Sequence, residues 1–202
     1  MTSMKMRDTK TDQLLTPQNA ALIIIDVQPI QVASLATMDK RTLVQNVKSL
    51  AEMARLYRLP TILSTVNVES GLNKPMIHQV TDVLSDIPIY DRTTLNAWED
   101  TEFLAAVKAT GRKKLIISAL WTEVCLAFPT LDALRDGFDV YPVVDACGST
   151  SEAAHRAGLD RMMQAGAKPV SWVSLICELQ RDWGRSETRD EFARILFAVE
   201  GS

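Results

Sequence analysis

The sequence lacks the features that mark disulfide-stabilised, membrane-spanning and nucleic-acid-binding proteins. Its 202 residues include only three cysteines, and these form no C-x-x-C pair, which argues against a disulfide framework and a thiolate zinc site. No apolar run reaches the roughly 18 residues that would cross a membrane, and no basic block interrupts the mixed charges, which sum to −3. Residues 1–18 are polar, without the apolar run of a signal peptide. We therefore expect a cytoplasmic protein with reduced thiols that binds neither nucleic acid nor a membrane.

What the sequence does contain is a regular alternation of apolar strands and helical segments. Residues 20–25 are continuously apolar, which is typical of a strand covered on both faces in a parallel sheet. The expected strands cover residues 20–25, 61–66, 87–90, 115–118, 138–144 and 169–172. The expected helices cover residues 41–58, 76–84, 100–110, 125–136, 151–165 and 174–183. This order predicts a three-layer α/β/α domain with a six-stranded, mostly parallel sheet and right-handed crossovers.

The length and the 47% hydrophobic content allow one substantial core and do not suggest two. We expect an N-terminal arm over residues 1–18, a single α/β domain over residues 19–185 and a helical tail over residues 186–202. The tail carries one apolar helical face, which would pack either on its own domain or against another subunit.

One stretch, residues 116–129, runs from a buried strand through a sharp turn into a helix that starts at or just before Cys125. A cysteine at a helix start faces backbone N–H groups and the positive end of the helix dipole, which favour thiolate over thiol. The alternative is a small buried hydrophobic residue. Pro129 lacks the N–H that would bond the carbonyl of Cys125, so the first helical turn cannot close normally.

Chemically complementary side chains follow several of the expected strands. Ligands of open parallel sheets bind outside the carboxyl ends of the strands, where the loops converge. Asp26 follows the first strand, Arg92 the third and Cys125 the fourth. An acid, a fixed cation and a thiol at one edge of a sheet form a candidate catalytic group. Asp145 follows the fifth strand, and we expect it to cap or brace a loop.

Other potential nucleophiles and ligand sites are placed less favourably. His78 and His155 fall in helical segments, which disfavours a papain-like Cys–His pair. Cys147 and Cys177 are expected to be structural. A Rossmann-type nucleotide site would need a glycine-rich turn after the first strand, and residues 26–30 contain no glycine.

Several of these segments together resemble the isochorismatase-like cysteine hydrolase superfamily, and within it the YcaC-like branch. The resemblance runs from about residue 12 to residue 183 and implies the isochorismatase-like (Rossmann-like) hydrolase fold. The segments that carry it are Ile-Ile-Asp26-Val-Gln28, Arg92 with residues 96–100, residues 122–125, residues 60–63, residues 137–140 and residues 178–183.

The resemblance implies a triad in which Asp26 is the general base and Cys125 the nucleophile. Arg92 takes a place that is usually lysine in the superfamily. Because guanidinium stays protonated at any relevant pH, Arg92 could stabilise a thiolate and orient substrate but could not shuttle protons. By the same resemblance the Leu120–Trp121 peptide bond would be cis, and the N–H groups of Trp121 and Cys125 would face one oxyanion position.

The resemblance also bears on the pocket and on metals. Gln28, Asn96 and Trp98 are the candidate substrate-pocket residues. Nicotinamidases of the superfamily carry a metal-binding Asp/His cluster after the second strand, whereas residues 66–71 contain no histidine. We therefore expect neither a metal nor another cofactor.

The activity implied by the resemblance is cleavage of a C–N bond in a small amide or carbamoyl-type substrate through a thioester. True isochorismatases lack the cysteine, so that activity is disfavoured. The alternative is a catalytically weak or inactive ligand-binding or scaffold homologue, in which Arg92 marks lost chemistry. Members of the branch form rings or larger assemblies, so we expect a homo-oligomer, either an octamer or a tetramer.

Overall fold

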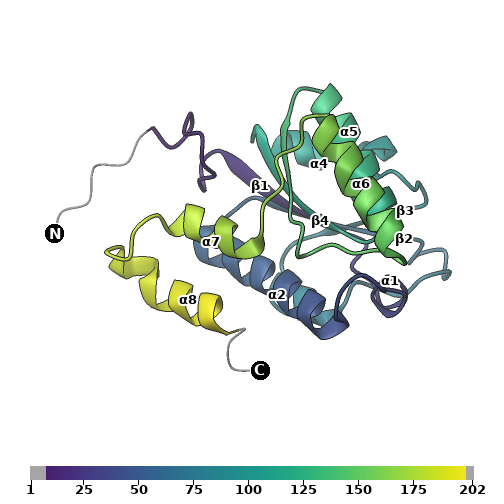
Figure 1. The fold of residues 1–202 in the computed structure, drawn as a ribbon, viewed down its shortest axis with the longest axis horizontal. Coiled ribbons are helices and arrows are strands. Elements are labelled where there is room, and N and C mark those ends of the chain that lie inside the picture. Colours follow the sequence, from purple (N-terminus) through teal and green to yellow (C-terminus); the bar gives the residue numbers. More distant parts are fainter. Residues whose placement is uncertain (1–7, 199–202) are drawn as a thin grey trace.

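The computed structural model describes residues 8–198, which form a parallel sheet between two layers of helices (Figure 1). The sheet has five strands in the order β3-β2-β1-β4-β5, and all four pairings are parallel. The strands are β1 (Ala20–Ile25), β2 (Thr61–Val66), β3 (Ile89–Arg92), β4 (Lys114–Ala119) and β5 (Asp139–Pro142). The predicted α/β class is confirmed. The expected arm and tail lie partly outside the described residues, at 1–7 and 199–202.

The expected sixth strand over residues 169–172 is wrong. This segment makes only one isolated bridge, between Val143 and Val170. Ser171 already has the extended backbone of a helix N-cap, and Trp172 is the first residue of α7. Because the helix starts directly after Val170, the extended segment is too short to add a strand to the sheet.

Helices cover both faces of the sheet (Figure 1). Leu22 and Ile24 of β1 pack in the hydrophobic cluster that includes α2 and α7, whereas Ile23 and Ile25 pack in the cluster on the other face, with α4, α5 and α6. β1 is apolar on both sides because it packs against one hydrophobic core on each face of the sheet. The helices are α1 (Pro29–Ala33), α2 (Lys40–Tyr57), α3 (His78–Thr81), α4 (Thr101–Ala109), α5 (Ala127–Arg135), α6 (Glu152–Gln164), α7 (Trp172–Gln180) and α8 (Ser186–Phe197).

Both ends of the described chain pack on the domain. The Lys114 ammonium donates to three carbonyls of the N-terminal segment, those of Asp12, Gln13 and Leu14, at 2.6, 2.8 and 3.2 Å. At the other end α8 lies against α2 and α7, with Phe192 and Ile195 buried. The apolar face of the tail therefore packs on its own domain. Among residues 8–198 there is no helix long and apolar enough to span a membrane.

Candidate active site

Asp26 leaves the end of β1 in a left-handed conformation, with φ +56°. Positive φ is uncommon for residues other than glycine. The conformation is held by the backbone on both sides of the residue: the Asp26 N–H donates to the Ser64 carbonyl at 2.9 Å, and the Asp26 carbonyl accepts from Gln28 N–H at 2.8 Å. The carboxylate is fully buried. A sharp turn at the carboxyl edge of the sheet therefore fixes an acid inside the protein.

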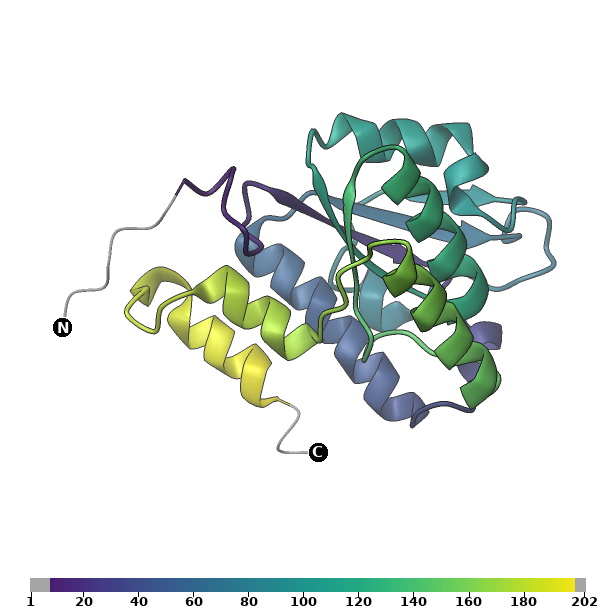
Figure 2. The same ribbon diagram turned by 45° about the horizontal axis from the view of Figure 1, so that its top comes forward.

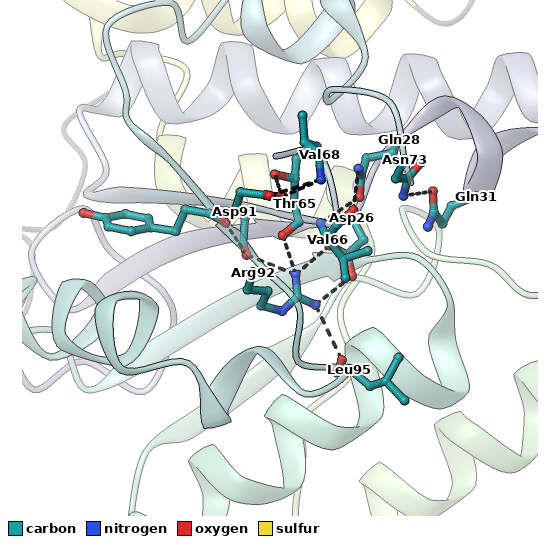
Figure 3. Close-up of polar contacts among 12 residues, drawn as sticks. Asp26, Gln28, Gln31, Thr65, Val66, Val68, Asn73, Asp91, Arg92 and Leu95 are labelled. Atoms are coloured by element: carbon teal, nitrogen blue, oxygen red, sulfur yellow. Dashed lines mark hydrogen bonds and ion pairs between the residues drawn. The ribbon is translucent and has the colours of Figure 1, made fainter. Parts of the chain in front are cut away.

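Arg92, the last residue of β3, faces this carboxylate with both ends of its guanidinium group (Figure 3). Nη1 and Nη2 each donate to one Asp26 oxygen at 2.7 Å. Nη1 also donates to the Thr65 carbonyl at 2.9 Å and to the Ser64 hydroxyl at 3.2 Å. Although burial alone would lower the pKa of Arg92, the hydrogen bonds and charge of Asp26 raise it. The two residues therefore form a fixed, bidentate, buried ion pair.

Cys125 lies beside this pair, close enough for the Asp26 carboxylate to act on its thiol. Burial raises the pKa of Cys125, and the charge and hydrogen bond of Asp26 raise it further. The charge of Arg92 and the Trp121 N–H oppose this shift without reversing it. Burial, and after it the charge of Asp26, thus opposes the thiolate that the helix start was expected to favour.

The turn that carries Cys125 is a π-helical segment over Thr122–Leu126, between β4 and α5. The predicted helix over residues 125–136 is thus divided, because α5 begins only at Ala127. Pro129 supplies the physical reason, since it has no N–H to donate to the Cys125 carbonyl. The Leu120–Trp121 peptide bond is cis, and the Trp121 N–H lowers the pKa of Cys125. One of the two expected oxyanion donors thus lies close enough to act on the Cys125 sulfur.

Gln28, a candidate pocket residue, is fully buried and holds the loop after β2 (Figure 3). Its Nε2 donates to the Lys74 carbonyl at 2.7 Å and to the Val66 carbonyl at 3.2 Å, and its Oε1 accepts from Val66 N–H at 3.1 Å. These contacts occupy both ends of the amide. Gln28 therefore ties residues 66–74 to the start of α1.

Asn96 and Trp98, the other two candidates, are tied to α5. Asn96 accepts from Trp98 N–H at 3.1 Å and donates to Asp132 at 2.7 Å. The Trp98 indole donates to Asp136 at 2.9 Å, and its ring lies in the same hydrophobic cluster as Cys125. Both side chains thus connect the loop after β3 to the helix that follows Cys125.

Comparison with known protein families shows which family the chain belongs to. The family model described as "Isochorismatase domain" matches residues 20–174. The chain belongs to the isochorismatase family. It is 39% identical over 176 residues to "Probable hydrolase YcaC" of Escherichia coli K12, covering 87% of this chain and 84% of that protein.

Two solved structures of YcaC proteins are also similar to this isochorismatase-family chain. YcaC from Pseudomonas aeruginosa, solved with hexane-2,5-diol and covalent acrylamide, is 36% identical, has a TM-score of 0.83 and covers 94% of this chain and 98% of its own. The Escherichia coli YcaC structure, described as an octameric hydrolase of unknown specificity, is 35% identical and also has a TM-score of 0.83. The match covers 95% of this chain and 98% of that one.

The sequence interpretation missed the residues that hold Arg92 and the loop beside it. Asp91 accepts from the Thr65 hydroxyl at 2.8 Å and from the N–H groups of Val68 and Glu69 at 3.1 and 2.9 Å (Figure 3). Burial alone would raise the pKa of Asp91, but these hydrogen bonds lower it. The signal in the sequence was an acid directly before the arginine at a strand end.

Asp145, Cys147 and Cys177 are the other acid and thiols that the sequence singled out. Asp145 accepts from Trp172 N–H at 2.9 Å and so braces the start of α7, as expected. Cys147 is buried, and burial raises its pKa to about 12. Cys177 is exposed. Within the described part of this isochorismatase-family chain, no three His, Cys, Asp or Glu side chains group in a way that could hold a metal ion.

Proposed function

We propose that this isochorismatase-family chain is a cysteine hydrolase that cleaves a C–N bond of a small amide or carbamoyl-type compound. The observation that supports this proposal is that one buried carboxylate, that of Asp26, is held by the Arg92 guanidinium and lies close enough to the Cys125 thiol to shift its pKa. A base in contact with a nucleophile, and itself oriented by a third group, is the arrangement that nucleophilic catalysis requires.

In the first half of the reaction the thiol proton passes to Asp26 as the sulfur bonds to the substrate carbonyl carbon. The negative charge that develops on the carbonyl oxygen is stabilised by the N–H groups of Trp121 and Cys125. Asp26 then gives its proton to the departing nitrogen, the C–N bond breaks, and an amine or ammonia leaves a thioester on Cys125.

In the second half Asp26 removes a proton from water, and the oxygen of that water bonds to the thioester carbon. The C–S bond then breaks, the acid product leaves, and the sulfur recovers the proton from Asp26. Both halves therefore use Asp26 first as base and then as acid. Arg92 keeps its protons throughout, and it holds the carboxylate in place and offsets the charge of the forming thiolate.

The test is ammonia release from a panel of amides, carbamates and N-carbamoyl compounds. We expect at least one of these substrates to be hydrolysed by the native protein and by Cys177→Ala, and by neither Cys125→Ala nor Asp26→Asn. Cys177→Ala is the matched control because it removes an exposed thiol outside the site. Equal hydrolysis by Cys125→Ala would exclude a cysteine mechanism.

A second candidate is a catalytically weak or inactive ligand-binding homologue. The observation that favours it is that Arg92 occupies both oxygens of the base while the pKa of Cys125 is raised. Acrylamide is a suitable probe, because the Pseudomonas aeruginosa relative was solved with covalent acrylamide. A ligand-binding homologue would bind such amides reversibly, release no ammonia and be unaffected by Cys125→Ser.

We also propose that the chain assembles into an octamer or a tetramer. The support comes from the Escherichia coli relative, which is described as octameric. Light scattering of the full chain measures the mass of the assembly directly, and a monomer of 22.4 kDa at micromolar concentration would exclude this proposal.

A further inference from the structure

Helix α6, the green helix of residues 152–164 in Figure 2, packs against the turn of residues 122–126 that carries Cys125. The point of contact is Gly158, in the middle of the helix. A Cβ atom there would lie 2.9 Å from the Cα of Glu123, 3.1 Å from its N and 3.2 Å from the carbonyl carbon of Thr122. All three are backbone atoms of the turn, so they could not move aside as a flexible side chain does.

Gly158 needs an explanation because glycine inside a helix costs about 1 kcal/mol relative to alanine. Its backbone is ordinary helix, without the positive φ that makes glycine necessary at a turn. The remaining reason for glycine is the close approach itself. The absence of a side chain at this position lets α6 lie directly on the backbone that leads to Cys125.

A polar contact beside Gly158 connects the same two elements. The Thr122 hydroxyl lies 2.9 Å from Nδ1 of His155, one turn earlier on α6. The same hydroxyl lowers the pKa of the buried Cys147, and the Thr122 N–H donates to the Gly148 carbonyl at 3.0 Å. Thr122 is fully buried, so its hydroxyl has these protein partners in place of water.

Thr122 directly follows Trp121, whose N–H acts on the Cys125 sulfur and lowers the pKa of the thiol. Any displacement of Thr122 therefore displaces that N–H group. The charged groups that face His155 are Glu123 of the turn and Glu152 of α6. Burial lowers the pKa of His155 more than these carboxylates raise it, so the ring is neutral at pH 7.

We propose that His155 and Gly158 are positioning residues, which hold Thr122 and through it the Trp121 N–H in the place that serves Cys125. The inference rests on the proposed function of Cys125 as the nucleophile. Neither residue contacts the reacting atoms. They act by fixing the backbone of the turn at Thr122 and Glu123, and misplacement of a catalytic group by about 1 Å can cost roughly a hundredfold in rate.

The first test is Gly158→Ala, with Gln164→Ala on the exposed surface of the same helix as control. We expect the added methyl group to push the turn away from α6 and to lower kcat roughly tenfold or more, with a smaller change in KM. Alkylation of Cys125 by acrylamide at fixed pH should slow as well, because a weaker Trp121 contact raises the thiol pKa. The control should match the native protein in both measurements.

The second test uses two matched pairs, in case Gly158→Ala fails to fold. Thr122→Val removes the hydroxyl and keeps the shape, whereas Thr122→Ser keeps the hydroxyl. His155→Leu removes the polar contact, whereas His155→Asn places an amide near the position of Nδ1. We expect Thr122→Val and His155→Leu to lower kcat and the rate of Cys125 alkylation about tenfold. Thr122→Ser and His155→Asn should keep most of the native kcat and alkylation rate.

Two results would overturn the inference. One is that Thr122→Val and His155→Leu keep native kcat and native Cys125 alkylation. The other is that all four variants lose activity in proportion to their loss of thermal stability, without rescue by Ser or Asn. If the native protein hydrolyses no amide, the proposed function fails by itself, and Cys125 alkylation still decides the positioning role.

Discussion

The Asp26 carboxylate and the Arg92 guanidinium are joined by two parallel hydrogen bonds of 2.7 Å, and neither side chain is exposed to solvent. Such a pair adds little stability compared with apolar packing, but removing one partner leaves a buried charge without compensation. Arg92→Met should therefore lower the free energy of unfolding by about 3–5 kcal/mol, as measured by urea denaturation. The exposed Arg156→Met is the control, and it should change the stability by less than about 1 kcal/mol. Equal effects of the two substitutions would mean that the ion pair is not buried in solution.

Asp26→Asn should change alkylation and hydrolysis in opposite directions. The negative charge of Asp26 raises the pKa of Cys125, and Arg92 lowers it. Removing the carboxylate charge therefore lowers the pKa of the thiol, and each unit of pKa gives roughly tenfold more thiolate at a fixed pH below it. Iodoacetamide should label Cys125 faster in this variant at pH 8, while hydrolysis falls. Mass spectrometry of the labelled peptides measures the rate at each cysteine. Slower labelling of Cys125 in the variant would contradict the assigned charge relationship.

In the native protein the exposed Cys177 should react with iodoacetamide faster than Cys125 below pH 8. Burial and Asp26 raise the pKa of Cys125, so its labelling should rise with each step in pH up to the alkaline limit of the experiment. Fast labelling of Cys125 at neutral pH would show a thiolate at rest. Rapid alkylation is therefore not the property that identifies this nucleophile.

Asp91 should make stability depend on acid pH. Its hydrogen bonds to the loop after β2 lower the pKa of the folded carboxyl below the ordinary value of 3.8. A lowered folded pKa contributes stability above the unfolded pKa, and this contribution is lost as the pH falls through the folded pKa. Asp91→Ala should therefore be less stable than the native protein at pH 6, and the difference should shrink below about pH 4. Thermal unfolding from pH 6 to pH 2 checks this, and a constant difference would contradict it.

Lys114 should anchor the N-terminal segment to the sheet. Its ammonium donates to three carbonyls in that segment, and Lys114→Met removes this donor, which leaves the Asn19 amide as the donor to the carbonyls of Asp12 and Leu14. We expect a loss of about 1–3 kcal/mol in the free energy of unfolding and faster proteolysis near Leu14. Lys113→Met, on the adjacent and more exposed lysine, is the control. Unchanged proteolysis would show that other contacts hold the segment.

The central strands could be predicted from the sequence because their apolar runs are unambiguous. Residues 20–25 and 61–66 are strands with the predicted bounds. The error at residues 169–172 arose because Val170 and Trp172 suit a strand and a buried helix equally well. What decides is the N-cap at Ser171, which starts α7. The short helix α1 was not predicted either, since five residues carry too little periodicity.

The positions of the candidate site residues could be predicted from the sequence, but the direction of the pKa shift of Cys125 could not. Strand ends place Asp26, Arg92 and Cys125 at one edge of a parallel sheet, and the structure brings the three together. The state of the thiol depends on burial and on a contact with Asp26, which no local pattern contains. The close contact between Gly158 and Glu123 was equally inaccessible, because it joins two segments that are distant in the sequence.

The most direct measurement is the intact mass of the protein during reaction with an activated acyl donor such as p-nitrophenyl acetate. The account predicts one acyl group per chain on Cys125, lost by hydrolysis in the native protein and retained much longer in Asp26→Asn, because Asp26 activates the water that cleaves the thioester. Absence of an adduct on Cys125, or equal deacylation rates in the native protein and Asp26→Asn, would contradict it.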